Sequence, residues 1–517
     1  MKGLFDLIGF VAVVLRGLDF VAQSVLLGSV AFVALILASA DVVDISRKVV
    51  RVAALAMVVT TAMSVAVTAL ALSASLGLGV RTLLGAPFVL TGAIKVAAAL
   101  CIFAVATQPI ASRTRQLACG VAGFAVLGAA LADSHAAARI QLSTSLLAAS
   151  AAHQLGAAIW LGGLPCLWLA LKREPDEATA IAIGRRYSAL AASGVALIVA
   201  GAAVFAIDYI GSVEAVYGTA YGAMAATKSA LLAILLVVGF ANFRTLRTAC
   251  ADTRARVARF VEIEMGVGIA VLMAAASITS TSPSVDLVSD RVTLTELVAR
   301  MKPAAPRLAS PSHEALEAGV SPMSGLRNDQ DRAWSEYNHH WAGLLVVLMG
   351  LAGFAQRSGR ARWASYWPLL FLLMAGFLLI RADPEVWPLG PRGVIESVAD
   401  PEVAQHRLFV AVIVAFALFE WRVRKGRTRS HHVARVFPLA TAIGGTLLLT
   451  HSHAVGDVKE QLLIEMTHLP IAVLGIVAGW ARWLEVSAPE GEGKIAGWVW
   501  PSAFVLIGLL LLDYREA

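Results

Sequence analysis

The residues in this chain best able to do chemistry are its histidines, because an imidazole can bind a metal ion or carry a proton. The chain has eleven histidines. Nine of them can be placed within a membrane or on one side of it, and the exceptions are His431 and His432. In the second half they stand at the ends of successive apolar runs: His339, His340, His406, His451, His453 and His468. We therefore predict that these imidazoles converge at one membrane surface.

A metal ion is the ligand that such a cluster favours. Imidazole suits Cu, Zn, Fe and Ni, and the thioether of Met466 beside His468 adds a preference for Cu(I). His451 and His453 can act together only outside a helix, since positions i and i+2 of a helix point to different faces. Three other interpretations stay open: amphipathic histidines at a headgroup boundary, a haem between two histidines, and a di-iron site based on the (i, i+3) pairs Glu336/His339 and Glu465/His468.

His153 differs from the others because it lies about three turns inside an apolar run, in AASAAHQLGAAIWLGGLPCLW. Small residues surround it, and Gly162 and Gly163 permit close approach of another helix. A hydrogen-bonded, packed histidine is the alternative. We predict His153 as a metal ligand at depth.

Other ionisable residues within apolar runs are candidate sites too, since a charge there is costly unless it is paired or hydrated. Lys95 and Lys228 each lie about two turns from the outer surface, toward which they can extend. Arg16 and Asp19 are one turn apart and are expected to neutralise each other. For Glu262 and Glu264, close to Arg259, we expect solvated or paired carboxylates.

The elements that must position these residues are membrane-spanning helices. Hydrophobic residues make up 58% and charged residues 15% of the 517 residues, far from the balance of a soluble domain, and the mean hydropathy is +0.75. A span needs about 20 apolar residues. The sequence predicts an all-α polytopic membrane bundle with about fourteen spans, at 5–38, 52–76, 87–107, 117–132, 142–171, 188–208, 221–241, 261–281, 339–355, 364–380, 407–421, 436–451, 462–483 and 496–512.

Arginine and lysine collect in alternate loops, as in Arg244 to Arg259 and Arg422 to Arg429, and such loops stay in the cytoplasm. Both termini then lie on the outer side of the membrane. The first run reads as a retained span rather than a cleaved signal. The net charge of +7 follows from this topology and gives no reason to expect nucleic acid as a partner.

The polar stretch 282–337 divides the chain into an eight-helix region (1–281) and a six-helix, histidine-rich region (338–517). Within the stretch, 291–301 is predicted to form a short surface helix. In the first region Lys95 and Lys228 are 133 residues apart, while Gly28 and Gly162, like Asp19 and His153, are 134 apart. A parallel repeat of four plus four spans is one interpretation, and transporters often bind at such repeat interfaces.

Residues 153–284 resemble the bacterial copper-resistance membrane protein D family (CopD/PcoD type). The resemblance rests on HQLGAAIWLGG, on YG-x5-K and NFR in YGTAYGAMAATKSALLAILLVVGFANFR, on E-x-G in RFVEIEMGVG, and on a closing SP. It implies a bacterial inner-membrane protein that moves copper, often alongside a periplasmic copper-binding protein. No periplasmic copper-binding β-domain is fused to this chain and no methionine-rich array is present, so the source of the copper stays open.

We therefore predict a copper-handling protein that captures copper ions on the periplasmic side and passes them inward. The candidate metal ligands are His153, His339, His340, His406, His451, His453, Met466 and His468. No phosphate-binding loop or ATPase motif is visible, so we expect a transporter-like protein rather than an enzyme. The alternatives are a haem or di-metal redox protein and a factor that delivers copper to a cuproenzyme without transport.

Overall fold

The fold is all-α, as predicted, and the computed structural model describes most of the chain. The described residues are 2–36, 40–110, 112–139, 143–248, 252–312, 329–383, 386–395, 401–426, 433–450, 458–489 and 493–516. Among them, eleven helices are long and apolar enough to cross a membrane. The predicted spans 407–421, 436–451 and 496–512 also coincide with helices, namely α18 (Pro401–Arg424), α19 (Val436–Leu448) and α21 (Ala496–Leu512).

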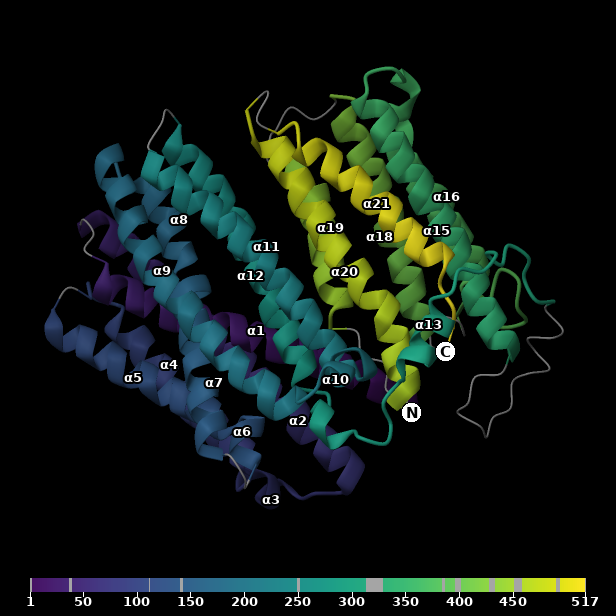
Figure 1. The fold of residues 1–517 in the computed structure, drawn as a ribbon. Coiled ribbons are helices and arrows are strands. Elements are labelled where there is room, and N and C mark those ends of the chain that lie inside the picture. Colours follow the sequence, from purple (N-terminus) through teal and green to yellow (C-terminus); the bar gives the residue numbers. More distant parts are fainter. Residues whose placement is uncertain are drawn as a thin grey trace. The chain divides into compact units, whose positions relative to one another are not determined.

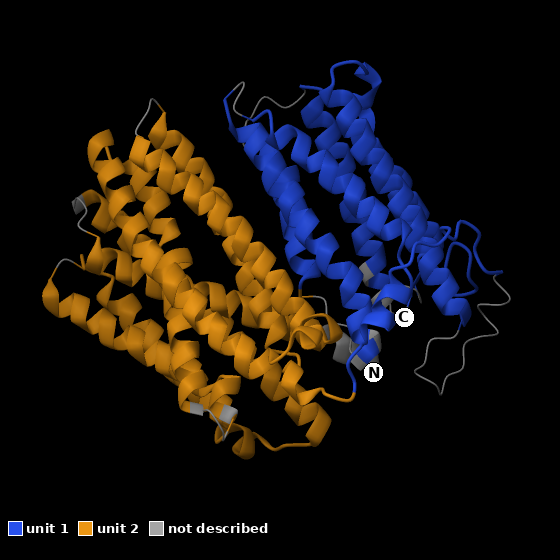
Figure 2. Ribbon diagram, in the orientation of Figure 1, with its two compact units in different colours: residues 1–4, 290–449, 453–517 blue, residues 5–289, 450–452 orange. Residues whose placement is uncertain are grey.

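The chain forms two compact units, shown in separate colours in Figure 2. Unit 2 consists of Phe5–Ser289 with Thr450–Ser452. Its elements, of which the α-helices are labelled in Figure 1, are α1 (Lys2–Leu35), α2 (Ala40–Leu76), α3 (Val80–Leu84), α4 (Pro87–Val105), α5 (Arg113–Ala132), α6 (His135–Ala138), α7 (Ser143–Ala157), η1 (Ala158–Gly162), α8 (Leu164–Arg173), α9 (Glu177–Phe205), η2 (Ala206–Ile210), α10 (Val213–Gly218), α11 (Ala220–Thr248), α12 (Thr253–Ile278) and η3 (Ser284–Asp286).

Unit 1 is the remainder of the chain: Met1–Leu4, Asp290–Leu449 and His453–Ala517. Besides α18, α19 and α21, its elements are α13 (Leu294–Arg300), α15 (Asp329–Arg357), η4 (Arg362–Leu369), α16 (Leu370–Arg381), η5 (Val433–Arg435) and α20 (Val458–Ser487). Aromatic rings fill its core, where Trp367 packs against Phe437 and Trp500.

Small residues lie inside unit 2 while large apolar side chains cover its surface, which is how a lipid-facing bundle is built. Val121 and Phe124, on α5, are 70% and 73% exposed. Inside, a Cβ at Gly28 would overlap the backbone of Ala158 and Gly162, so α1 and η1 meet backbone to backbone. The predicted close approach at Gly162 is therefore confirmed.

The predicted run 142–171 is interrupted in the middle. Residues 158–162 form the π-helical turn η1, between α7 and α8. Pro165 lacks the N–H that would continue the α-helical hydrogen bonding, and the preceding glycines tolerate the change of path. Single π-helical turns within α-helices are frequent at functional sites, and this one carries Trp160.

The short helix predicted at 291–301 is α13. The Thr293 hydroxyl accepts from the backbone of Glu296, and the Glu296 carboxylate accepts from the backbone of Thr293, which makes a capping box. Lys459 of α20 donates to the same carboxylate at 3.0 Å. These hydrogen bonds, those from Thr293 first, lower the pKa of Glu296 from 4.5 to about 2.

Acid should loosen α13. Because the folded-state pKa of Glu296 lies below its ordinary value, its stabilising effect is complete above pH 4.5 and is lost as the pH falls towards 2. We expect amide exchange in Leu294–Arg300, corrected for its intrinsic pH dependence, to speed up about threefold between pH 6 and pH 3. Glu296→Gln should exchange at the faster rate at both pH values. An unchanged rate at pH 3 would contradict the assignment.

Candidate functional site

Unit 2 contains a cavity of about 540 Å³. Its lining begins at the loop residues Asp133, Ser134 and His135 and follows α7 inward. The lining side chains of α7 recur at helical spacing and end at the π-turn: Ser150, His153, Gln154, Ala157, Trp160 and Leu161. The cavity therefore extends about three turns along this helix, and most of its polar groups come from predicted spans.

His153 lies on this wall, with its ring held in one orientation. Its Nδ1 donates a hydrogen bond to the backbone carbonyl of Ile198 at 3.1 Å, and the ring meets Phe205 edge-on. With the proton on Nδ1, Nε2 keeps the lone pair that a metal ion requires. Gly201 makes this fit possible, since a Cβ there would lie 2.9 Å from that of His153.

Asp19 and Lys95 form a buried ion pair on another part of the lining. Lys95 Nζ lies 3.1 Å from Asp19 Oδ2, and each side chain is 8% exposed. The hydroxyls of Thr60 and Thr61 donate to Asp19 Oδ1 at 3.1 and 2.5 Å. The expected Arg16–Asp19 pairing is therefore wrong. Arg16 donates to the Thr279 hydroxyl instead, and Lys95 is paired internally rather than extended to the surface.

Lys228 lines the same cavity from α11. Within the described residues no carboxylate contacts its ammonium group. One cavity lining therefore contains both pairs of residues that the sequence offset matches, Lys95/Lys228 and Asp19/His153.

A carboxylate that sequence reasoning underestimated lies beside the cavity. Glu264 is 3% exposed and has no basic partner among the described residues. It accepts hydrogen bonds from Trp160 Nε1 at 3.3 Å and from the side-chain amide of Asn242. The expectation of a solvated or ion-paired group is wrong for Glu264. It is correct for Glu262, which pairs with Lys172 at 3.0 Å.

A sequence signal for this cluster did exist. Trp160 belongs to the WLGG motif, Asn242 to NFR and Glu264 to E-x-G. In the sequence alone these motifs indicate only a family resemblance. Their side chains form one hydrogen-bonded group although they come from three separate helical segments.

In unit 1 two predicted ligands come together. The rings of His339 and His468 have centroids 6.4 Å apart at an angle of 80°. Nδ1 of each ring donates to the carbonyl four residues earlier, of Ser335 and Ile464 respectively, so Nε2 carries the lone pair. The two imidazoles are therefore neighbours in unit 1. Tyr514 stacks on His339 at 3.9 Å.

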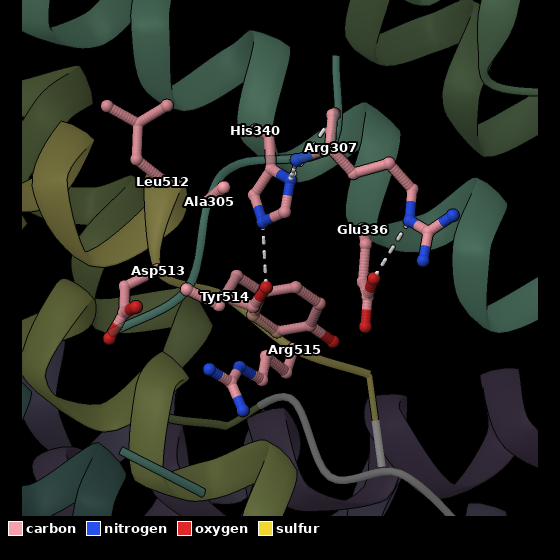
Figure 3. Close-up of a pocket in the computed structure, with 9 residues that line it drawn as sticks. Ala305, Arg307, Glu336, His340, Leu512, Asp513, Tyr514 and Arg515 are labelled. Carbon is pink, nitrogen blue, oxygen red and sulfur yellow. Dashed lines mark hydrogen bonds and ion pairs between the residues drawn. The ribbon is translucent and has the colours of Figure 1, made fainter. Parts of the chain in front are cut away.

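His340 has a different role in the structure. Figure 3 shows its ring between the loop at Arg307 and the chain end at Tyr514, in a pocket of about 320 Å³. Its Nδ1 accepts from the Arg307 backbone N–H at 2.6 Å, and its Nε2 donates to the Tyr514 carbonyl at 2.8 Å. Both ring nitrogens are thus engaged by the backbone, which ties three segments of unit 1 together.

Of the remaining predicted ligands, the structure describes His406 and Met466. His406 Nδ1 lies 2.6 Å from an Asp383 carboxylate oxygen, and Met466 lies on α20, two residues before His468. His451 and His453 lie outside the described residues. Among the residues the structure describes, no three His, Cys, Asp or Glu side chains are close enough to hold one metal ion. The (i, i+3) pairs make no di-metal centre there, because Glu336 binds Arg307 and Glu465 accepts from Gln461.

Comparison with known proteins links unit 2 to copper. Residues 181–278 match the Copper resistance protein D family. This match lies within 153–284, so the resemblance seen in the sequence is confirmed over that segment, which contains Lys228, Asn242 and Glu264.

A stretch of 131 residues is also 34% identical to the "Copper transport protein CutJ" of Bacillus subtilis (strain 168). The alignment covers 25% of this chain and 24% of that protein, so the chain matches about a quarter of the relative's length. No solved structure matches the chain. Unit 2 therefore carries a segment of copper-resistance type within a multi-pass helical membrane protein.

Proposed function

We propose that this protein takes up copper through the cavity of unit 2 and passes it across a membrane. The observation that carries the proposal is the position of His153, which presents a metal-binding nitrogen inside a cavity next to a segment of the copper-resistance family. Imidazole binds copper well. The cavity would give copper access to His153, which a histidine packed within the bundle would not have.

The topology we propose has fourteen spans with both termini in the periplasm of a bacterial inner membrane. The loop residues Asp133 to His135, where the cavity lining begins, then face the periplasm. A parallel four-plus-four repeat within residues 1–281 is supported by the contact of Gly28 with Gly162 and by the shared cavity of the matched residues. Such a repeat interface is a common place for a transport site.

The six-helix region 338–517 would supply the first contact with copper. We propose His339 and His468 as a two-nitrogen capture site, with Met466, His406, His451 and His453 as further ligands predicted from the sequence. His340 is left out of this set because both its ring nitrogens bind the backbone. A periplasmic copper-binding protein is the partner we propose as the source of the ion.

Metal content of the purified protein tests the capture site. Wild type incubated with copper and then desalted should retain stoichiometric copper, and His339→Ala/His468→Ala should lose it because two nitrogen ligands are removed. Ser502→Ala, which removes a hydroxyl that bonds only to the backbone of α21, is the control and should retain copper. Elemental analysis gives the ratio and an absorption spectrum identifies other centres. Iron or a haem band in place of copper would contradict the proposal and favour a redox protein.

A further inference from the structure

The cavity of unit 2 carries more positive than negative charge along its inner lining. The Asp19–Lys95 pair is neutral as a unit. Lys228 also lines the cavity, and among the described residues no carboxylate contacts it. Arg16 and Asp133 are exposed residues of the lining, one basic and one acidic, so the excess of positive charge comes from Lys228.

This charge balance is unfavourable for a bare metal cation. Cations repel each other strongly where the surroundings have a low dielectric constant, and an unpaired ammonium group within a span is itself costly. A small anion would lower both costs. Carboxylate oxygens form strong charge-assisted hydrogen bonds with lysine and arginine.

The size and polarity of the cavity point the same way. A volume of about 540 Å³ is typical of pockets for small organic molecules and far exceeds what one ion needs. Besides its charged residues, the lining offers hydrogen-bonding groups from several helices: Gln23, Thr61, Ser64, Thr68, Ser150, Gln154, Tyr209 and Tyr221. His153 is its one histidine on a long helix, since His135 lies in the loop region and donates to a backbone carbonyl.

We infer that the cavity accepts copper as an anionic complex with a small carboxylate-bearing molecule rather than as the bare ion. Lys228 and Arg16 bind the carboxylates of the complex, and His153 Nε2 takes one coordination position on the copper as a carboxylate leaves it. No electron transfer is involved, and the complex moves as a unit. This inference rests on the proposed function and specifies the chemical class of its cargo.

Binding of copper complexes with opposite charges tests the inference. The full-length protein is placed in nanodiscs of phosphatidylcholine, which contain no anionic lipid. The probes are the anionic copper(II)–citrate complex, the cationic copper(II) bis-ethylenediamine complex and citrate alone. The variants are Lys228→Met, which removes the charge, and Lys228→Arg, which keeps it. Lys48→Met removes an exposed lysine from α2 and serves as a matched control.

We expect copper–citrate to bind wild type, Lys228→Arg and Lys48→Met alike, and Lys228→Met about tenfold more weakly, since one charge-assisted contact is lost. The cationic complex should bind wild type more weakly than copper–citrate does. Lys228→Met should strengthen binding of the cationic complex, because the repelling charge is removed. Equal binding of both complexes, unaffected by Lys228→Met, would overturn the inference while leaving a copper site. Binding of citrate alone, with no copper complex bound in any variant, would overturn the proposed function itself.

Discussion

Asp19→Asn should destabilise unit 2 by about 3–5 kcal/mol, the usual cost of leaving one buried charge without its partner. The ammonium of Lys95 would then face a neutral amide in a site where both side chains are only 8% exposed. The new amide N–H groups would also have to point at donors, because Thr60, Thr61 and Lys95 all donate to the present carboxylate. Unfolding by SDS in mixed micelles gives the free-energy change.

The double variant Asp19→Asn/Lys95→Met is the control for this experiment. It removes the charge of Lys95 together with that of Asp19, so we expect it to be clearly more stable than Asp19→Asn alone. The difference between the single and double variants measures the coupling of the pair. If Asp19→Asn were as stable as wild type, water in the cavity would be hydrating Lys95, and the ion pair would contribute little.

His153→Ala should reduce copper passage by about tenfold or more, since it removes the one deep nitrogen ligand that we propose for the path. Copper bound by the purified His153→Ala protein at the His339/His468 site should not change, because those residues lie in unit 1. The measurement is copper uptake into proteoliposomes that enclose a fluorescent chelator. Retained copper content with lost uptake is the expected combination.

Two further variants separate ligation from packing. In His153→Asn the side-chain amide can still donate to the Ile198 carbonyl but offers no imidazole nitrogen, so uptake should stay low. Phe205→Leu disturbs the ring that meets His153 edge-on and keeps the imidazole, so uptake should persist. Uptake at the wild-type rate in both His153 variants would contradict a path through the cavity. The protein would then capture and deliver copper without transporting it.

The helices of this protein could be predicted from the sequence because a bilayer imposes length and apolarity on each span. The position of His153 within a helix and the close approach at Gly162 could also be predicted, since an isolated polar residue and a glycine pair stand out in an apolar run. The partner of Asp19 could not. Helical spacing favours a neighbour one turn away, whereas the structure pairs Asp19 with a lysine 76 residues later.

The same limit applies to Glu264 and His340. The sequence places Glu264 near Arg259 but gives no information that Trp160 and Asn242, on other helical segments, enclose it. His340 looks equivalent to His339 in the sequence. Adjacent positions of a helix point about 100° apart, so His339 faces His468 while His340 faces the backbone of Arg307 and Tyr514. Tertiary contacts, which periodicity does not encode, decide these roles.

Trp160 both lines the cavity and donates its indole N–H to the buried Glu264. The cavity wall and the buried carboxylate therefore share one side chain, and the hydrogen bond to Glu264 holds the indole at the inner end of the cavity. A substitution that removes this acceptor would change the cavity wall although Glu264 is not one of the residues that line it.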